Sequence, residues 1–142
     1  MEPTDFLKTA KLLKTHAQEP HLRTSISRSY YGAFLYFREH LRALGLEKTK
    51  KPSLDAHAFV IQCLGFSQVT EGSKASKYLH DLQQVREDAD YHLDKKFSQN
   101  DAEDTFVKAR KVINDYQKNI TAEKEKQLIE NATGFAKRKS WI

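Results

Sequence analysis

A long apolar stripe at helical spacing, between residues 22 and 44, constrains the fold more than any other feature of this chain. Six apolar residues there follow one another at intervals of four, three, four, four and three: Ile26, Tyr30, Ala33, Phe37, Leu41 and Leu44. Because an α-helix turns once every ~3.6 residues, this spacing places all six on one face. Pro20 precedes the segment, and Gly45 follows it as a residue typical of helix C-terminal caps. The stripe therefore predicts a helix from about Leu22 to Leu44 with one buried face.

Four further segments have helical spacing, and none alternates between apolar and polar residues as a half-buried strand would. They are expected at about Thr4 to Gln18, Leu54 to Leu64, from near Ser73, and from Ser98 to about Ile120. The inner stripe of the segment that starts near Ser73 is Tyr78, Leu82, Val85 and Ala89. Thr4 is a possible cap of the first segment, Ser53 or Asp55 of the third, and Ser98 with Asp101 has the capping-box pattern. Five glycines and three prolines leave little room for the turns of an all-β protein. The sequence predicts an all-α, antiparallel bundle of about five helices.

The apolar pattern weakens after Ile120, so we expect two parts: residues 1–120 as the bundle, and residues 121–142 as a charged C-terminal helix extension or tail. The last part carries five basic and three acidic residues and ends in KRKSWI. Basic and aromatic residues together can bind single-stranded RNA. The candidate nucleic-acid-binding residues are therefore Lys137, Arg138, Lys139 and Trp141. Two alternatives stay open: a solvated end, or a segment in which Phe135 and Trp141 dock into a partner.

Bulk properties favour a single basic domain in a reducing compartment. The length of 142 residues suits one domain, and the net charge of +5 favours phosphate-rich partners. Cys63 is the only cysteine, which fits a cytoplasmic location. No apolar run approaches the ~20 residues of a membrane span, and the N-terminus lacks the pattern of a signal peptide. The histidines show no zinc-site spacing and no glycine-rich phosphate loop occurs, so we expect no metal, no cofactor and no membrane contact.

The stretch VREDADYHL, residues 85–93, carries the strongest functional signal. RNA can be cleaved without a metal by its own 2′-hydroxyl group, given a group that moves protons and a cation for the phosphate. Histidine as a residue type titrates near neutral pH, so His92 is a candidate to move the proton, and Arg86 offers a planar fork of donors that matches phosphate oxygens. Asp90, four residues after Arg86, can orient its guanidinium. Glu87 repels a phosphate, whereas Tyr91 can stack on a base or supply a hydroxyl.

Helix geometry limits how Arg86 and His92 can cooperate. At ~100° per residue, His92 lies about 120° around a straight helix from Arg86. Either the helix ends near Asp90 and frees His92, or a two-fold dimer brings both pairs into one cleft. In the purely structural alternative, His92 continues the inner stripe from Val85 as a packing histidine, and Arg86–Asp90 is an ordinary surface ion pair.

Three segments together resemble a known family. They are SISRSYYGAFLYFREHL in the second predicted helix, DAHAFVIQCL in the third and LQQVREDADYHLD in the fourth. Their order and spacing resemble the HEPN domain, an all-helical family, and in particular its branch with S-R-x-Y-Y and R-x-x-A-D-Y segments. The resemblance covers roughly Thr4 to Tyr116.

The resemblance implies a helical bundle that dimerises. Many members are metal-independent endoribonucleases of toxin–antitoxin, abortive-infection or CRISPR systems, with an arginine, four to six residues, and a histidine as the active motif. Arg86 and His92 match this motif with five residues between them. The chain departs from it at Glu87, where active members usually carry Asn, Asp or His, and members of the A-D-Y branch often lack the histidine.

The resemblance also implies supporting residues and a partner. Arg28, Tyr31 and His57 would line the cleft, and a nucleotidyltransferase would act as the antitoxin. The alternative for Tyr31, together with Tyr30, is a core or interface residue, and the alternative for His57 is a structural histidine with satisfied hydrogen bonds.

We therefore expect a homodimeric HEPN-like ribonuclease that acts on RNA, as the toxin of a toxin–antitoxin or phage-defence system. The main alternative is a non-catalytic HEPN interaction module that binds a nucleotidyltransferase partner or nucleic acid. A purely structural helical adaptor is the third hypothesis.

Overall fold

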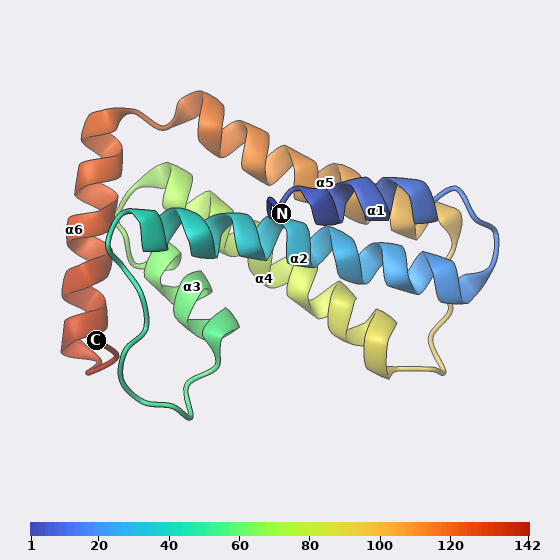
Figure 1. Ribbon diagram of the computed structural model, residues 1–142, viewed down its shortest axis with the longest axis horizontal. Helices are drawn as coiled ribbons and strands as arrows, with labels where there is room; N and C mark the ends of the chain where they lie inside the picture. The colour runs from blue at the N-terminus through green and yellow to red at the C-terminus, as the bar shows by residue number, and fades with distance from the viewer.

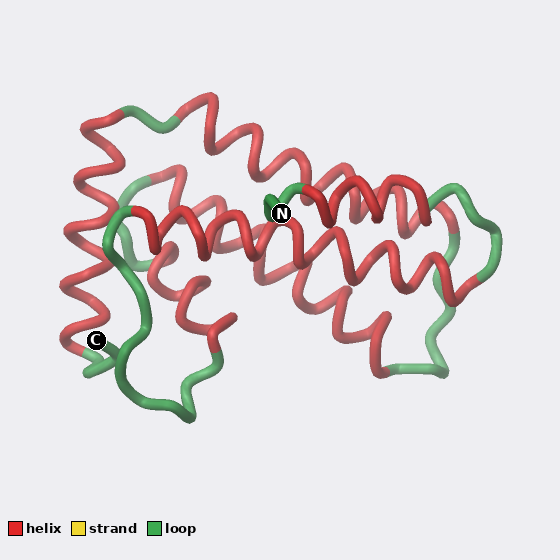
Figure 2. Tube along the Cα trace, viewed as in Figure 1, coloured by secondary structure: helices red, strands yellow, loops and turns green.

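The computed structural model describes residues 1–142, and every regular element in it is an α-helix, as Figure 2 shows. The helices in chain order are α1 (Asp5–Leu13), α2 (Glu19–Ala43), α3 (Ala56–Gly65), α4 (Thr70–Tyr91), α5 (Gln99–Asn119) and α6 (Ala122–Arg138). The predicted all-α class is confirmed. The predicted number of about five is one too few, because residues after Ile120 form a helix of their own. No helix has the length and apolar character that crossing a membrane requires.

The helix predicted from the long apolar stripe is α2, and it lies at the centre of the bundle. It packs against α1, α3, α4 and α5 (Figure 1). Five of the six stripe residues are buried, and Leu44 lies half-buried at the C-cap. Gly45 has φ +92°, a conformation that glycine adopts without strain, and it lets the Leu46 N–H reach the Leu41 carbonyl at 2.9 Å. Leu46 is thereby turned back into the core, where it is 1% exposed.

Local capping sets most of the other helix starts. In the predicted capping box of α5, Ser98 Oγ accepts from the Asp101 N–H at 3.2 Å, and Asp101 Oδ2 accepts from the Ser98 N–H at 2.8 Å. Asp55, not Ser53, caps α3 by accepting the His57 N–H. The Thr4 side chain makes no capping hydrogen bond, and α1 ends at Leu13, short of the predicted end at Gln18.

The inner face of α4 differs from the predicted one by about one residue. Of the predicted stripe, Leu82 and Ala89 are buried, but Tyr78 and Val85 are only half-buried. Their neighbours Leu79 and Arg86 are buried in their place. The difference arises because α4 packs against three neighbours, α2, α3 and α5, so its buried arc follows their arrangement. Because the buried face of α4 is turned by about one residue from the predicted one, the Arg86 side chain points into the bundle.

Residues 121–142 form a separate helix that crosses the end of the bundle, rather than a continuation of α5 or a tail (Figure 1). Ile120 is extended, with ψ 136°, and the Thr121 side chain caps α6. Four residues of α6 are buried: Leu128, Ala132, Phe135 and Ala136. Beyond α6, the Trp141 carbonyl accepts hydrogen bonds from the N–H groups of Thr49 and Lys50, at 3.1 and 2.9 Å. These contacts connect the C-terminus to the α2–α3 connection.

Candidate functional site

Arg86 is a buried arginine on the inner face of α4, with 6% of its surface exposed. Its guanidinium carbon lies 5.3 Å from the ring centroid of Tyr30 and 5.5 Å from that of Tyr31. Its Nη1 lies 3.7 Å from Asp90 Oδ2, and its Nε has no hydrogen-bond partner. A guanidinium tolerates such a place because it is weakly hydrated and stacks on aromatic faces. The burial of Arg86 excludes the alternative of an ordinary surface pair with Asp90.

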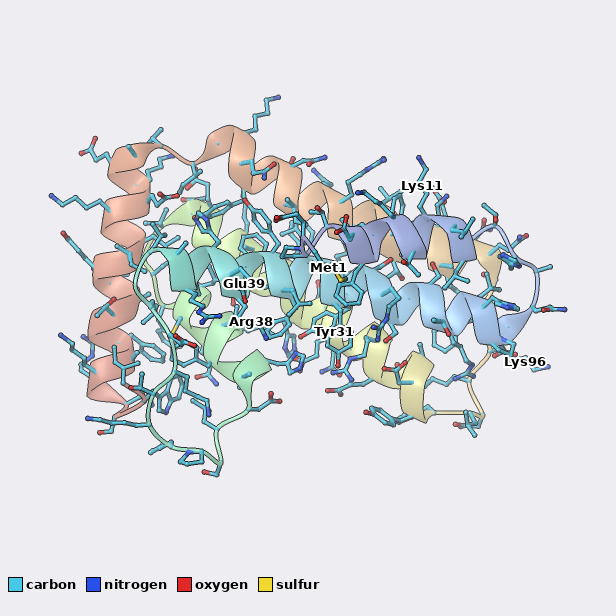
Figure 3. The ribbon with its side chains drawn as sticks, viewed as in Figure 1. Met1, Lys11, Tyr31, Arg38, Glu39 and Lys96 are labelled. Atoms are coloured by element: carbon cyan, nitrogen blue, oxygen red, sulfur yellow. The ribbon has the colours of Figure 1, made fainter.

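A second guanidinium, that of Arg28, also packs against the Tyr31 ring. The Arg28 guanidinium carbon is 4.9 Å from the Tyr31 ring centroid, and its buried Nε also lacks a partner. Ser27 Oγ lies 3.4 Å from Arg28 Nη2 and 3.2 Å from Asp90 Oδ2, which links the two arginines through their polar neighbours. Figure 3 marks Tyr31 on α2. The structure thus brings together α2 and α4 residues that the sequence had proposed as one cleft.

His57 enters the same cluster from the start of α3. Its Nδ1 lies 2.6 Å from the Tyr30 hydroxyl, and its ring stacks on Phe34 at 4.1 Å between centroids. Burial is the main cause that lowers the pKa of His57 and the main cause that raises the pKa of Tyr30. A neutral imidazole facing a protonated phenol accepts at Nδ1 and carries its own proton on Nε2. His57 therefore orients the Tyr30 ring that lies against Arg86, in keeping with the structural role given as its alternative.

His92 lies just past the end of α4, which stops at Tyr91, close to the end near Asp90 that was one of the two alternatives for bringing His92 toward Arg86. As the C-cap residue it has φ −104° and ψ 85°, and its side chain is 53% exposed. The hypothesis of a packing histidine on the inner stripe is therefore wrong, because the stripe ends with the helix. The His92 Nδ1 lies 3.8 Å from Asp88 Oδ1, and no hydrogen bond or ion pair joins His92 to Arg86 in the protomer. The cluster around Arg86 and the imidazole of His92 are separate groups within one chain.

The other residues of the stretch 85–93 lie next to Arg86 and His92 in the chain. Tyr91 is 71% exposed and Leu93 is 82% exposed, one on each side of His92. Glu87 is half-buried, and its charge acts on Tyr30 and His57. The carboxylate therefore adds negative charge next to the arginine cluster.

The proposed basic and aromatic contact at the C-terminus divides into two parts. Lys137, Arg138 and Lys139 are exposed, but Trp141 is only 6% exposed. The Trp141 ring packs against Phe59 and Phe135, with centroids 6.0 and 5.3 Å apart, so it is not open to stack on a base. Figure 1 shows the end of α6 and the end of α4 at opposite ends of the molecule. The structure does not bring this segment to the Arg86 cluster.

Two polar residues of α2 that contact the site were missed by sequence reasoning. Ser27 hydrogen-bonds Asp90, and Arg23 donates to backbone carbonyls at the end of α4. Both lie on the face of α2 that holds Tyr30, since residues 23, 27 and 30 are spaced by four and three. That spacing is the signal by which they could have been found.

The cluster holds two guanidinium groups, and the exposed imidazole of His92 follows Arg86 by six residues. A guanidinium is suited to bind a phosphate, and an imidazole is suited to move a proton.

Comparison with known proteins identifies the family. A family model described as HEPN domain matches residues 4–120, which include α1 to α5 and all residues of this cluster. No curated protein and no solved structure matches the chain. HEPN domains often dimerise and bind RNA, and the match supports a nuclease or nucleotide-related function in general. Because the matched residues make up most of the sequence, this chain belongs to the HEPN domain family.

Proposed function

We propose that this chain is a metal-independent endoribonuclease whose active site forms at the cleft of a homodimer. The observation that carries the proposal is the buried Arg86 guanidinium with an unpartnered Nε, six residues before an exposed histidine at a helix end. A fold rarely leaves a buried donor unpaired, because an unmade hydrogen bond costs ~1–3 kcal/mol, so such a group is a candidate for ligand binding.

In the proposed reaction, His92 accepts the proton of a ribose 2′-hydroxyl. The 2′-oxygen then attacks the adjacent phosphorus, and the bond from phosphorus to the 5′-oxygen breaks. The products are a 2′,3′-cyclic phosphate and a 5′-hydroxyl end, whose proton comes from water or from a second, protonated histidine. Arg86 neutralises the charge on the phosphate oxygens, while Asp90 and the Tyr30 and Tyr31 rings hold its guanidinium.

The proposal requires a dimer because no hydrogen bond or ion pair joins Arg86 and His92 of one protomer. A two-fold axis near the end of α4 repeats Arg86 and His92 across one cleft. The exposed Tyr91 and Leu93 support an interface there, since large apolar residues exposed close together in the chain are candidates for contact with a partner. Tyr91 would then stack on a base or pack in the interface.

The biological role that fits this activity is the toxin of a toxin–antitoxin or phage-defence system, restrained by a nucleotidyltransferase-type partner. Lys137, Arg138 and Lys139 would form a second RNA contact, separate from the cleft, at the exposed end of α6. Trp141 is left out of this surface because its ring is packed inside.

One observation favours a second candidate, a non-catalytic HEPN module that binds a nucleotidyltransferase or nucleic acid. Glu87 directly follows Arg86, and its carboxylate repels a phosphate at the place where cleavage needs one. This module would use the same surface for binding alone.

Incubation of the purified protein with RNA in EDTA separates the two candidates. The wild type should release fragments with cyclic phosphate ends, and His92→Ala should lower the rate by roughly 10²–10⁴-fold, the usual contribution of a proton-transfer group. His80→Ala is the matched control, because His80 is an exposed histidine on the same helix, and it should cleave like the wild type. Intact RNA that is nevertheless bound by the wild type would establish the binding module instead.

The shared cleft has its own test. Mixing the Arg86→Met and His92→Ala variants should restore part of the activity, because the mixed dimer keeps one arginine and one histidine. No recovery in a mixture that demonstrably exchanges subunits would contradict a shared site.

A further inference from the structure

The end of α4 is held by a side chain from another helix. The last carbonyl groups of a helix have no partners within it, and they carry the negative end of the helix dipole. A cationic donor that binds several of them therefore stabilises the helix end. In this protein that donor comes from α2.

Arg23 binds the helix end and the turn that follows. Its Nη1 donates to the Ala89 carbonyl at 2.9 Å and to the His92 carbonyl at 3.1 Å, with the Asp88 carbonyl at 3.5 Å. Its Nη2 donates to the Lys95 carbonyl. The side chain is only 13% exposed. Its hydrogen bonds to Asp88 and Ala89 are partly buried, whereas those to His92 and Lys95 lie at the surface.

Glu19, one turn earlier on α2, completes the arrangement. Its Oε1 accepts from Arg23 Nε and Nη2 at 3.2 and 3.0 Å, and from the Phe97 N–H at 3.3 Å. The Arg23 guanidinium also lies over the Phe97 ring, 5.0 Å from its centroid. The two side chains thus connect α2 to both ends of the segment between α4 and α5.

The segment between α4 and α5 begins at His92, so its backbone determines where the His92 imidazole lies. The imidazole is half-exposed, and its nearest charged contact is 3.8 Å away, so its own contacts hold it weakly. Its backbone is better held: the N–H donates to the Asp88 carbonyl at 3.0 Å, and the carbonyl accepts from Arg23 and, at 3.2 Å, from the Lys95 N–H. Arg23 is therefore the side chain that ties the backbone of His92 to the rest of the bundle.

We infer that Arg23 is a positioning residue for His92. The inference rests on the proposed function in one respect, namely that His92 moves the proton. Lysine cannot replace the arginine, because an ammonium has three donors around one nitrogen, whereas the planar guanidinium reaches carbonyls on both sides and a carboxylate.

The test compares Arg23→Gln and Arg23→Lys with the wild type. Single-turnover RNA cleavage should fall at least tenfold in both variants, while the dissociation constant for RNA stays within twofold, because Arg86 remains in place. Amide hydrogen exchange of residues 92–97 should accelerate, whereas exchange within α2 and α5 should not. Arg42→Gln is the matched control: Arg42 is an exposed arginine on α2 that pairs only with Glu39 and Glu47, and it should change neither measurement.

The two measurements distinguish failure of the inference from failure of the proposed function. Unchanged exchange at residues 92–97 in both Arg23 variants overturns the inference, whatever the cleavage rate. Unchanged cleavage in Arg23→Lys, with exchange accelerated and with His92→Ala inactive, overturns it as well. If the wild type cleaves no RNA, the proposed function fails, and the exchange data alone decide whether Arg23 holds His92. Should Arg23→Gln fail to fold, Arg23→Lys, which keeps a positive charge at the same position, provides the second variant with the same expectations.

Discussion

Replacing Arg86 by methionine should raise the stability of the protein while it removes RNA cleavage. Methionine has a similar length but carries neither charge nor donor. The substitution therefore keeps most of the packing against Tyr30 and Tyr31 and removes a buried charged group whose Nε has no partner. Under the proposed function, this guanidinium is retained for RNA cleavage at the expense of stability.

The magnitude follows from the contacts of the guanidinium. The unpartnered Nε costs ~1–3 kcal/mol. The two aromatic contacts stabilise the folded state by ~0.5–2 kcal/mol each. The ion pair with Asp90, whose side chain is 28% exposed, stabilises it by less than ~1 kcal/mol. Desolvation of the charge adds a cost of several kcal/mol, and replacement of buried charged groups by apolar ones is commonly neutral to stabilising by ~1–4 kcal/mol. We expect a gain of about 1–2 kcal/mol, which for a domain of this size raises Tm by about 3–6 °C.

Urea denaturation and thermal melting followed by circular dichroism measure this gain. The control is Arg42→Met, because the Arg42 side chain is 59% exposed, and it should change the free energy of unfolding by less than ~0.5 kcal/mol. A loss of more than about 1 kcal/mol in Arg86→Met would refute the reasoning. It would mean that the aromatic and carboxylate contacts of the guanidinium outweigh its desolvation, and that Arg86 is primarily structural.

Two further predictions concern pH and the C-terminal helix. Burial lowers the pKa of His57 in the folded state below 6.5, so the unfolded state binds the proton more readily. The free energy of unfolding should therefore fall as the pH drops below about 6.5, and His57→Gln should reduce that slope in urea denaturation at pH 7.5 and about 5.5, whereas His80→Gln should not. Leu128→Ala, at a position that is 0% exposed in α6, should cost ~2–5 kcal/mol. It should shift one common melting transition if residues 121–142 fold together with the bundle, and a separate low-temperature transition would instead identify α6 as an independent unit.

The individual helices could be predicted from the sequence because their causes are local. The stripe from Ile26 to Leu41 defines a buried face by spacing alone, and Gly45 and the Ser98–Asp101 capping box mark helix ends through backbone hydrogen bonds close in the chain. Arg86 and His92 could be proposed as a pair from their residue types and the family resemblance. Helix α6 was not predicted as a separate element, because its cap at Thr121 carries no strong local signal and its buried face exists only against the other helices.

The environment of each candidate residue was decided by the tertiary structure. Spacing defines an inner face only to within about one residue, or ~100°, and that one residue separates a surface arginine from a buried one at position 86. The aromatic partners of Arg86 come from α2, with His57 of α3 behind them, and no sequence pattern sets how three helices cross. The sequence by itself determined the first five helices and which side chains can do chemistry. The packing of those helices decided that Arg86 is buried and that His92 is exposed, because burial depends on neighbours that lie far away along the chain.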